Sequence, residues 1–407
     1  MKLTKYKLGE ILDVTRGASL SGEFYATEGK YIRLTCGNFD YQNNCFKENK
    51  SKDNLYYVGD FKSDFLMEEG DIITPLTEQA IGLLGSTAII PESGKYIQSQ
   101  DVAKIICKEE LLDKDFAFYL ISSTLVKQQL SAAAQQTKIR HTSPDKIRDC
   151  TVWIPELAEQ KRIGKLLRSL DRKIELNRAI NQNLETMAKQ LYDYWFVQFD
   201  FPNEEGKPYK SSGGEMVWNE KLKRDIPASW KTKAIEDIAD VYNGATPSTV
   251  NEQNYGGDIV WITPKDLSDQ KQKFVYLGER KISQAGYNSC STHLLPPNTI
   301  LMSSRAPIGL LSIAKTELCT NQGFKNFVPK AENISTYLYY YLNIHIRQIE
   351  QLGTGTTFKE VSREDVLKFP ILKPSDTILD LWEERVSALN NKQFEIQSLF
   401  KFYLITS

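Results

Sequence analysis

The spacing of apolar residues predicts two long helices, the first in the middle of the chain. Between Pro155 and Pro202 the sequence has no other proline, and its only glycine is Gly164. Apolar residues recur here at alternating steps of four and three, the heptad spacing of a coiled coil. These positions are Ile163, Leu167, Leu170, Ile174, Leu184, Ala188, Leu191 and Trp195, with Asn177 and Asn181 as polar members of the seam. A helix over 157–197 would be about 60 Å long at 1.5 Å per residue.

The second predicted helix follows Pro374, after which the chain contains neither proline nor glycine. Ser375, Asp376 or Thr377 can cap its start. Its seam consists of Leu379, Trp382, Val386, Leu389, Gln393, Ile396, Phe400 and Tyr403. Two seams in one chain can bury each other, so the pattern favours an intramolecular antiparallel pair with one globular domain at each end. The alternative, in which each helix packs on its own domain, is less favoured because a helix near 60 Å exceeds the span of a small domain.

An internal duplication accounts for most of the remaining sequence. LGEILDVTRGA (Leu8–Ala18) returns as IEDIADVYNGA (Ile235–Ala245). Further matches follow in the same order: YIRLT with IVWIT, IGLLG with IGLLS, Ser99-Gln100 with Asn321-Gln322, FAFYL with YLYYYL, and VWIP with ILKP. The repeat is too long for a solenoid and indicates a duplicated domain with its trailing helix. Between the matches the copies diverge: 36–70 shares little with 264–297.

Each copy is predicted to mix short strands with helices. Strands are expected at 31–35, 71–74, 102–107, 259–263, 299–302 and 324–328, and helices at 113–130 and 333–351. The predicted fold is therefore α+β, with tandem duplicated α/β domains, each followed by a long helix, and the helices paired as an antiparallel coiled coil with pseudo-two-fold symmetry. The expected boundaries are 1–155 and 229–374 for the domains, 156–199 and 375–407 for the helices, and 200–228 for a linker.

Composition excludes several classes of protein. Lys and Arg total 51 against 52 for Asp and Glu, so the chain lacks the overall basic charge of a simple nucleic-acid binder and would need a local basic face. The six cysteines form no CxxC pair, and the three histidines lie far apart, so no zinc site is expected. We found no signal-peptide pattern and no apolar run of transmembrane length, and scattered free thiols fit a reducing cytoplasm.

The stretch 157–230 resembles the central region of Type I restriction–modification specificity subunits. The resemblance lies in EQ-x-x-I (Glu159–Ile163), LLRSLDRKI, YWF (Tyr194–Phe196), FDFP, KPYKSSG and IPxxW (Ile226–Trp230), which occur in the order typical of that family. Together with the duplication, the resemblance covers nearly the whole chain. One departure is the second helix, which opens PSDTILDLWEERV and lacks the Glu159-Gln160 pair of the first.

The resemblance implies a function for each part of the chain. The domains 1–155 and 229–374 would be target-recognition domains, each reading one half of a split, asymmetric site in double-stranded DNA, and the helices would set the gap between the halves. Two modification subunits, and in some complexes two restriction subunits, would be the partners. This chain would bind no cofactor: S-adenosylmethionine, and ATP with magnesium in a restriction complex, would belong to those partners. The residues expected at the subunit contacts are Glu159, Gln160, Ile163, Tyr194, Trp195 and Phe196.

Polar residues at matched loop positions are the candidates for DNA contacts. Arginine can clamp guanine, and asparagine or glutamine can clamp adenine, through two hydrogen bonds in the major groove. Basic residues near the first domain–helix junction can follow the phosphates, although a solvated coiled-coil face explains part of that cluster equally well. The candidates are Asn38, Gln79, Gln100, Lys138, Arg140, Lys146 and Arg148 in the first copy, and Lys265, Arg305, Gln322, Thr354, Thr356 and Lys359 in the second.

No catalytic residue is predicted. Leu295–Asn298 (LPPN) lacks the residues that an adenine methyltransferase motif requires around its prolines, and Pro144-Asp145 with Glu159-Gln160-Lys161 matches a PD…ExK nuclease only formally, because its second part opens a long helix. The alternatives left open are a protein-interaction scaffold that uses the coiled coil alone and a self-sufficient nuclease or methyltransferase. Salt-sensitive duplex binding would distinguish a DNA reader from the scaffold.

Overall fold

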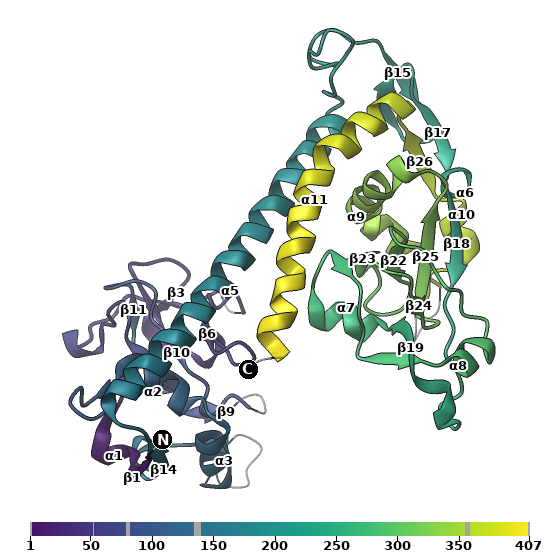
Figure 1. Ribbon diagram of the computed structural model, residues 1–407. Coiled ribbons are helices and arrows are strands. Elements are labelled where there is room, and N and C mark those ends of the chain that lie inside the picture. The colour runs from purple at the N-terminus through teal and green to yellow at the C-terminus, as the bar shows by residue number, and fades with distance from the viewer. Residues whose placement is uncertain (1, 52, 79–81, 134–139, 355–358, 406–407) are drawn as a thin grey trace. The chain divides into compact units, whose positions relative to one another are not determined.

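The structure is a computed structural model that describes residues 2–51, 53–78, 82–133, 140–354 and 359–405 (Figure 1). The chain forms two compact units, Met1–Lys173 and Ile174–Ser407, and the boundary falls inside the first long helix. No helix among the described residues is long and apolar enough to cross a membrane.

The first unit is built on two four-stranded sheets. One has the order β10-β8-β12-β2 and is antiparallel, and the other has the order β11-β4-β7-β3, with β11 and β4 parallel. Helices α2 and α3 pack on the first sheet through a shared apolar core. The strands are β1 Thr4–Lys7, β2 Leu12–Arg16, β3 Tyr25–Ala26, β4 Tyr31–Arg33, β5 Phe39–Asp40, β6 Cys45–Phe46, β7 Tyr56–Tyr57, β8 Ile72–Pro75, β9 Thr77–Glu78, β10 Ala88–Ile89, β11 Tyr96–Ile97, β12 Val102–Cys107, β13 Arg140–His141 and β14 Thr151–Ile154; the helices are α1 Leu8–Ile11, α2 Lys114–Ile121, α3 Thr124–Ala133 and α4 Pro144–Arg148.

The second unit repeats this plan with a five-stranded sheet, β18-β25-β22-β23-β20, and a three-stranded sheet, β21-β19-β24. Helix α9 takes the place of α2 and α3. The strands are β15 Met216–Asn219, β16 Arg224–Pro227, β17 Lys231–Ala234, β18 Ala239–Asn243, β19 Tyr255–Ile262, β20 Phe274–Val275, β21 Arg280–Ile282, β22 Ile300–Ser303, β23 Leu311–Ala314, β24 Cys319–Thr320, β25 Phe324–Pro329 and β26 Pro370–Lys373; the helices are α6 Ile235–Ile238, α7 Pro264–Gln270, α8 Gln284–Asn288, α9 Ser335–Gln351 and α10 Arg363–Leu367.

The turn at Gly17-Ala18, and its counterpart at Gly244-Ala245, show how closely the backbones of the two units agree. The amide of Ala18 donates to the Gln98 carbonyl at 3.0 Å, and the amide of Ala245 donates to the Thr320 carbonyl at 2.9 Å. A Cβ on the preceding Gly17 would lie 2.3 Å from that same Gln98 oxygen, and a Cβ on Gly244 would lie 2.1 Å from the Asn321 oxygen. The glycine before each alanine is therefore required by a close backbone approach, and the duplication predicted from the sequence is confirmed in three dimensions.

The two long helices are α5, Leu157–Tyr192, which continues as a π-helical turn over Asp193–Val197, and α11, Asp376–Ile405. Trp382 contacts Tyr192 and Trp195, whereas Gln393, eleven residues later, donates to the carbonyl of Asn181 at 3.2 Å. As residue numbers increase along α11, the residues of α5 that they contact decrease in number. The second half of α5 and α11 are therefore antiparallel, as predicted (Figure 1).

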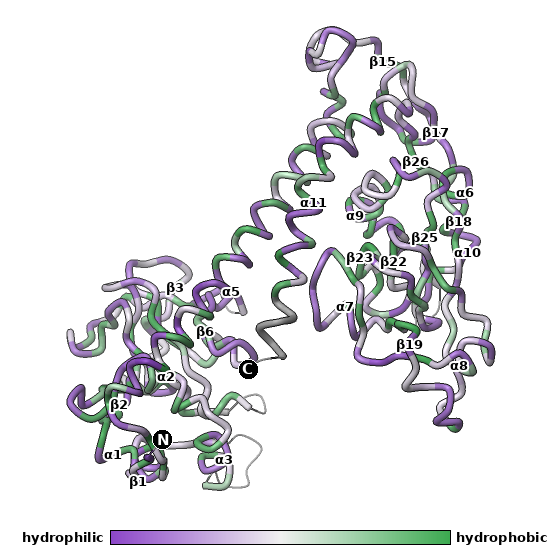
Figure 2. The backbone as a smooth tube through the Cα atoms, viewed as in Figure 1, coloured by the Kyte–Doolittle hydropathy of each residue, from purple (hydrophilic) through white to green (hydrophobic). Residues whose placement is uncertain are grey.

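The predicted seam is found in the second half of α5, where the seam positions from Ile174 to Trp195 are buried or half-buried and most residues between them are exposed. The first half of α5 packs on its own unit, where Arg168 pairs with Asp115 and Tyr119 donates to Asp171. On α11, Leu379, Trp382, Val386, Gln393 and Ile396 are buried. The alternation of apolar and polar residues along both helices is visible in Figure 2. The side chains of Phe400 and Tyr403, the last predicted seam members, lie outside the described residues. The helix expected over 113–130 is two helices, because the chain turns at Ser122-Ser123.

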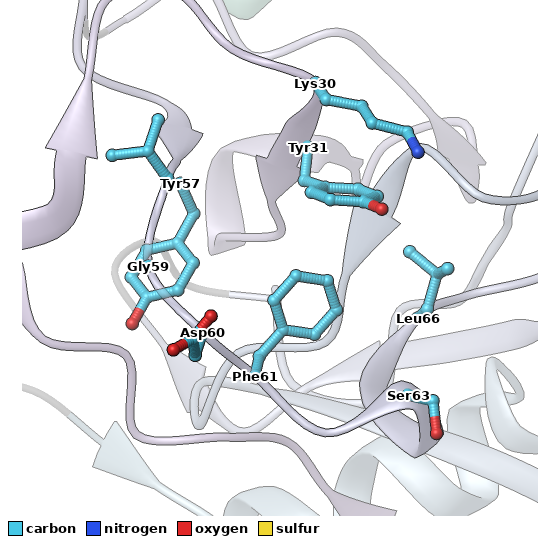
Figure 3. A pocket seen from close by; sticks show the side chains of 9 residues that line it. Lys30, Tyr31, Tyr57, Gly59, Asp60, Phe61, Ser63 and Leu66 are labelled. Carbon is cyan, nitrogen blue, oxygen red and sulfur yellow. The ribbon is translucent and has the colours of Figure 1, made fainter.

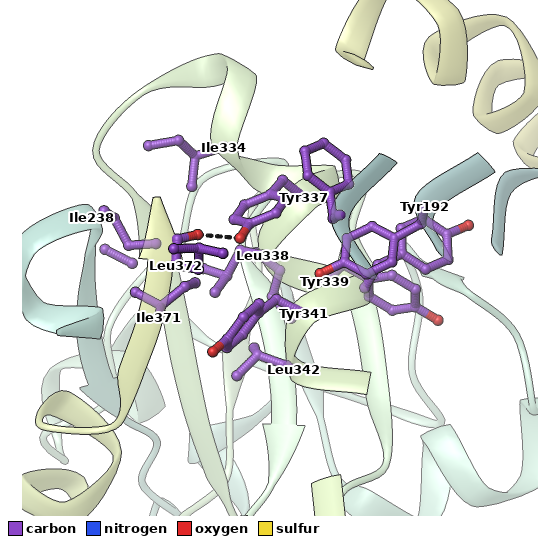
Figure 4. Packing of buried hydrophobic residues seen from close by; sticks show 14 of the residues in the cluster. Tyr192, Ile238, Ile334, Tyr337, Leu338, Tyr339, Tyr341, Leu342, Ile371 and Leu372 are labelled. Atoms are coloured by element: carbon purple, nitrogen blue, oxygen red, sulfur yellow. Dashed lines mark hydrogen bonds between the residues drawn. The ribbon is translucent and has the colours of Figure 1, made fainter. Parts of the chain in front are cut away.

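The core of the second unit takes in the end of α5. Tyr192 stacks on Tyr340 with ring centroids 5.4 Å apart, and Phe196 contacts Tyr337 and Trp382. Figure 4 shows part of this cluster, in which the Tyr337 hydroxyl donates to the Leu372 carbonyl. The aromatic run at the end of the first helix thus anchors that helix in the second unit.

A buried lysine joins the same helices to the sheet. The Lys273 ammonium, on a side chain only 6% exposed, donates to Glu185 Oε2 of α5 at 3.0 Å, Asn390 Oδ1 of α11 at 2.8 Å and the Tyr340 hydroxyl of α9 at 2.6 Å. Burial lowers the pKa of Lys273, and the Glu185 carboxylate opposes that change. An ammonium so removed from water is stable only because these acceptors replace its hydration.

Candidate functional site

In each unit a short antiparallel bridge closes the loop that precedes the last small helix. In the first unit β9 pairs with β13, and the Thr142 amide donates to the Leu76 carbonyl at 2.9 Å. In the second unit Arg305 pairs with Glu360, and the Val361 amide donates to the Ser304 carbonyl at 3.0 Å. The two bridges are therefore equivalent in their backbone.

Several candidates gather around the bridge of the second unit. Arg305 donates from Nε to Glu360 Oε2 at 2.9 Å, and its side chain is 50% exposed. Thr354 and Glu360 exchange backbone hydrogen bonds of 3.1 and 3.0 Å, and exposed Lys359 stands beside them. The structure thus brings together Arg305, Thr354 and Lys359, which lie on two distant segments of the sequence.

Glu360 is held from a second side by a buried cation. Lys325 Nζ lies 3.2 Å from Glu360 Oε1, and the lysine side chain is 6% exposed. Partial burial acts to raise the pKa of Glu360, but Lys325 and Arg305 outweigh it and the pKa falls below its usual value. The carboxylate therefore stays ionised between two cations, and the group as a whole carries one net positive charge.

The two glutamine candidates occupy matched turns next to these bridges. The carbonyl of Asp101, next to Gln100, accepts from the Leu76 amide at 2.8 Å. The carbonyl of Gly323, next to Gln322, accepts from the Ser304 amide at the same distance. Gln100 and Gln322 are both exposed, and Gln322 accepts from the Thr246 hydroxyl. The bridge and this turn therefore form one polar surface in each unit.

Other candidates are engaged inside the first unit. Asn38 is buried, accepts from the Thr35 amide at 2.9 Å and donates to the Lys47 carbonyl at 3.3 Å. Lys146 donates to the Ala133 carbonyl, and Arg148 bonds Asp13, Asp145 and the Val14 carbonyl. In the second unit Lys265 pairs with Glu279 at 3.0 Å but remains mostly exposed. Gln79, Lys138, Thr356 and the side chain of Arg140 lie outside the described residues.

The residues expected at subunit contacts differ in how far they are exposed. Gln160 is buried, accepts from the Asp113 amide and donates to the Leu111 and Pro155 carbonyls, so it ties the start of α5 to the first unit. Glu159 pairs with Arg162, Ile163 is half-buried, and Trp195 and Phe196 lie in the core of the second unit. Tyr194 alone among the three aromatics of that run is substantially exposed, at 38%.

An exposed apolar stripe on α5 was not predicted. Leu176, Ile180 and Met187 are 55%, 42% and 54% exposed and follow one another at steps of four and seven. Tyr194, in the π-helical turn that continues α5, follows Met187 after seven more residues. Residues so spaced lie on one face of a helix. The spacing could have been found in the sequence, but it runs beside the stronger seam and is hidden by it. We define Leu176, Ile180, Met187 and Tyr194 as the α5 stripe.

An aromatic-walled cavity of about 520 Å³ lies in the first unit, and most of its lining residues fall within 36–70, where the two copies share little. Figure 3 shows the rings of Tyr31, Tyr57 and Phe61 around it, with Lys30 and Asp60 beside them. Tyr31 and Phe61 meet edge to face with centroids 5.0 Å apart. These rings pack on each other and so stabilise the insert that carries them.

The formal nuclease motif is occupied by local ion pairs. Asp145 binds Arg148 at 2.8 Å, and Glu159 binds Arg162 at 2.6 Å, each three residues along its own helix. Within 2–51, 53–78, 82–133, 140–354 and 359–405, histidine, cysteine and carboxylate side chains form no group of three that could hold a metal ion.

Comparison with known proteins gives a consistent set of relatives. A family model described as the Type I restriction modification DNA specificity domain matches residues 2–186 and 227–392. The MjaIX Type I restriction enzyme specificity subunit of Methanocaldococcus jannaschii is 42% identical over 152 residues, which are 37% of this chain and 35% of that relative. The HindI Type I restriction enzyme specificity subunit of Haemophilus influenzae is 25% identical over 351 residues, 74% of this chain and 75% of the relative.

A solved structure shares the fold. The S subunit of a Type I restriction-modification system from M. genitalium superposes with a TM-score of 0.58 at 14% sequence identity, covering 98% of this chain and 94% of that one.

Proposed function

Because this chain belongs to the family of Type I restriction–modification DNA specificity subunits, we propose that its two domains read the two halves of a split, asymmetric DNA site. A subunit of this family binds DNA sequence-specifically and is itself non-catalytic. The observation that carries the proposal of two unlike half-sites is that the two units share a backbone arrangement but differ in side chains at equivalent positions. Thr77 and His141 occupy the bridge of the first unit, and Arg305 and Glu360 occupy that of the second. Two unlike readers predict two unlike half-sites.

The exposed candidates are the proposed DNA contacts. Gln100 in the first domain and Arg305, Gln322, Thr354 and Lys359 in the second lie on the bridge surfaces, and Lys265 adds an exposed cation. Amide and guanidinium groups suit base edges, whereas lysine suits phosphates. Methyl transfer would belong to modification subunits that carry S-adenosylmethionine, and ATP-dependent cleavage to restriction subunits where these are present.

The test is a methylation map of plasmid DNA from cells that make this chain with its modification subunit, compared with cells that lack only this chain. The expected result is a split motif with one methylated adenine in each half, present only with this chain. If the assembled subunits produced no such motif and the chain bound no duplex in a salt-dependent way, the coiled-coil scaffold would replace the reader.

We further propose that the α5 stripe is a docking surface for a modification subunit. Single exposed apolar side chains are ordinary, but four on one helical face are more than chance exposure requires. The stripe lies directly beside the seam with α11, so a partner helix laid along it would extend the existing helix pair.

Replacing Met187 or Ile180 with aspartate is expected to weaken capture of the modification subunit by about tenfold or more, because burial of an apolar side chain is lost and a charge must be desolvated. Binding can be measured by calorimetry with the purified modification subunit. Gln182→Asp, on an exposed position of α5 away from the stripe, is the matched control and should bind normally. Equal loss in all three variants would count against the stripe.

A further inference from the structure

The bridge of the second domain carries three charged side chains, Arg305, Glu360 and the buried Lys325, that its backbone pairing alone does not explain. One backbone hydrogen bond is equivalent in the two bridges, from Thr142 to Leu76 in the first domain and from Val361 to Ser304 in the second. At the next pair the first domain has Thr77 and His141, whose Oγ1 and Nδ1 atoms lie 3.4 Å apart.

At the position of Thr77 and His141 the second domain has Arg305 and Glu360, with the buried Lys325 behind the carboxylate. The first bridge instead has its arginine, Arg140, opposite Glu78, one pair further along the strands. The Arg305–Glu360 pair is therefore a feature of this backbone position in the second domain, where the first domain has a threonine and a histidine.

The strands fix where the arginine begins. Arg305 and Glu360 are directly paired, and the hydrogen bonds Val361–Ser304 and Thr354–Glu360 hold the backbone on both sides of the pair. Glu360 then holds the far end of the arginine through Nε at 2.9 Å. Both ends of a long, otherwise mobile side chain are therefore restrained before any ligand arrives.

The bond through Nε leaves the guanidinium fork available. Within the part of the chain that the structure describes, Nη1 and Nη2 of Arg305 make no hydrogen bond, and the side chain is half exposed. Two parallel N–H groups match the O6 and N7 acceptors of guanine in the major groove. An arginine ordered in advance loses less conformational entropy on binding than a free one.

Lys325 explains how a carboxylate can be tolerated so close to DNA. An unneutralised glutamate would repel the phosphates and weaken binding at every sequence. Lys325, buried behind Glu360 and 3.4 Å from Ser304 Oγ, cancels that charge from the protein side. The outward-facing charge is then that of the arginine.

We propose that Glu360, neutralised by Lys325, is a positioning residue that presents the fork of Arg305 to a guanine in the half-site read by the second domain. This proposal rests on the proposed function, since it assigns one base contact within it. The first domain has Thr77 and His141 at the equivalent place, so this contact is assigned to the second domain only.

The test measures the affinity of the full chain, assembled with its modification subunits, for duplexes carrying the mapped site with each base pair of the second half-site changed in turn. The wild type is expected to require G·C at one position. Arg305→Ala should reduce that preference roughly five- to hundredfold, and Glu360→Gln should reduce it about two- to tenfold at the same position only. Asp240→Asn, which removes another exposed carboxylate–lysine pair of the same domain, should leave every preference unchanged.

Glu360→Gln leaves a buried ammonium without its carboxylate and could unfold the domain, so Glu360→Gln/Lys325→Met is measured beside it. The double variant should show the same loss at the same position. If Arg305→Ala weakened binding equally at all sequences and reduced the salt slope by about one, Arg305 would be a phosphate contact and the proposal would be overturned. Full G·C preference in a folded Glu360 variant would also overturn it. Absence of any sequence preference in the wild type would instead remove the proposed function itself.

Discussion

A chain with one extra heptad in each long helix will direct methylation to a motif whose unread gap is about three base pairs longer. Seven residues lengthen a helix by about 10.5 Å, and successive base pairs lie about 3.4 Å apart. Duplicating 177–183 in α5 and 390–396 in α11 adds the heptads where the helices face each other, because Gln393 contacts Asn181 there. A whole heptad preserves the seam, so the pair should still form.

The measurement is the same methylation map, and the original motif should lose its modification while the half-site sequences stay the same. Seven residues inserted after Gly206, in an exposed turn of the linker, form the control and should leave the gap unchanged. If the gap stays fixed when both helices are lengthened, the helices do not set the spacing and that part of the proposed function fails.

Lys273→Met is expected to lower the free energy of unfolding by about 3 kcal/mol, the low end of what is found when one partner of a buried ion pair is removed. The low end applies because the Glu185 side chain is 28% exposed and can be partly hydrated. The loss also leaves the Tyr340 hydroxyl and the Asn390 amide oxygen without their donor. Glu185 lies on α5, Asn390 on α11 and Tyr340 on α9. The variant should therefore loosen the two long helices, α5 and α11, from the domain together. Urea unfolding followed by tryptophan fluorescence would measure the change.

Two further variants make the result specific. Lys273→Met/Glu185→Gln should recover about 1–2 kcal/mol, because the uncompensated carboxylate is gone while Gln393 keeps its acceptor. Lys392→Met, which breaks the exposed pair with Glu395 on α11, should change stability by less than about 0.5 kcal/mol. A cost below about 1 kcal/mol for Lys273→Met would mean that the ammonium is hydrated.

The long helices could be predicted because a heptad pattern is a local property that survives in any context. Leu379, Trp382 and Val386 are apolar at seam spacing and are buried as expected. The duplication was equally accessible, because Gly17 and Gly244 are demanded by the same backbone contact in each copy. What the pattern missed at 113–130 was a turn at two serines between segments of similar hydropathy.

The bridge could not be predicted, because its chemistry joins residues far apart in sequence. Its residue type and its matched loop position make Arg305 a candidate, but nothing local connects it to Glu360, 55 positions later. Lys273 lies in the polar segment QKQKF, where a lysine normally indicates exposure, and only the packing of three helices buries it. Asn38 was chosen for its amide, but that amide is used within its own turn.

The first and last strands of each domain have a consequence for how such a protein can change its target. Thr4 lies opposite Ile154 in the β1·β14 pair, and Lys231 lies opposite Lys373 in the β17·β26 pair, so the chain enters and leaves each domain at one place. A segment with adjacent ends can be exchanged for another of the same frame without displacing the helices that flank it. If each domain reads one half-site, as proposed, recombination of one such segment would give a new half-site while the gap and the partner subunits stay the same.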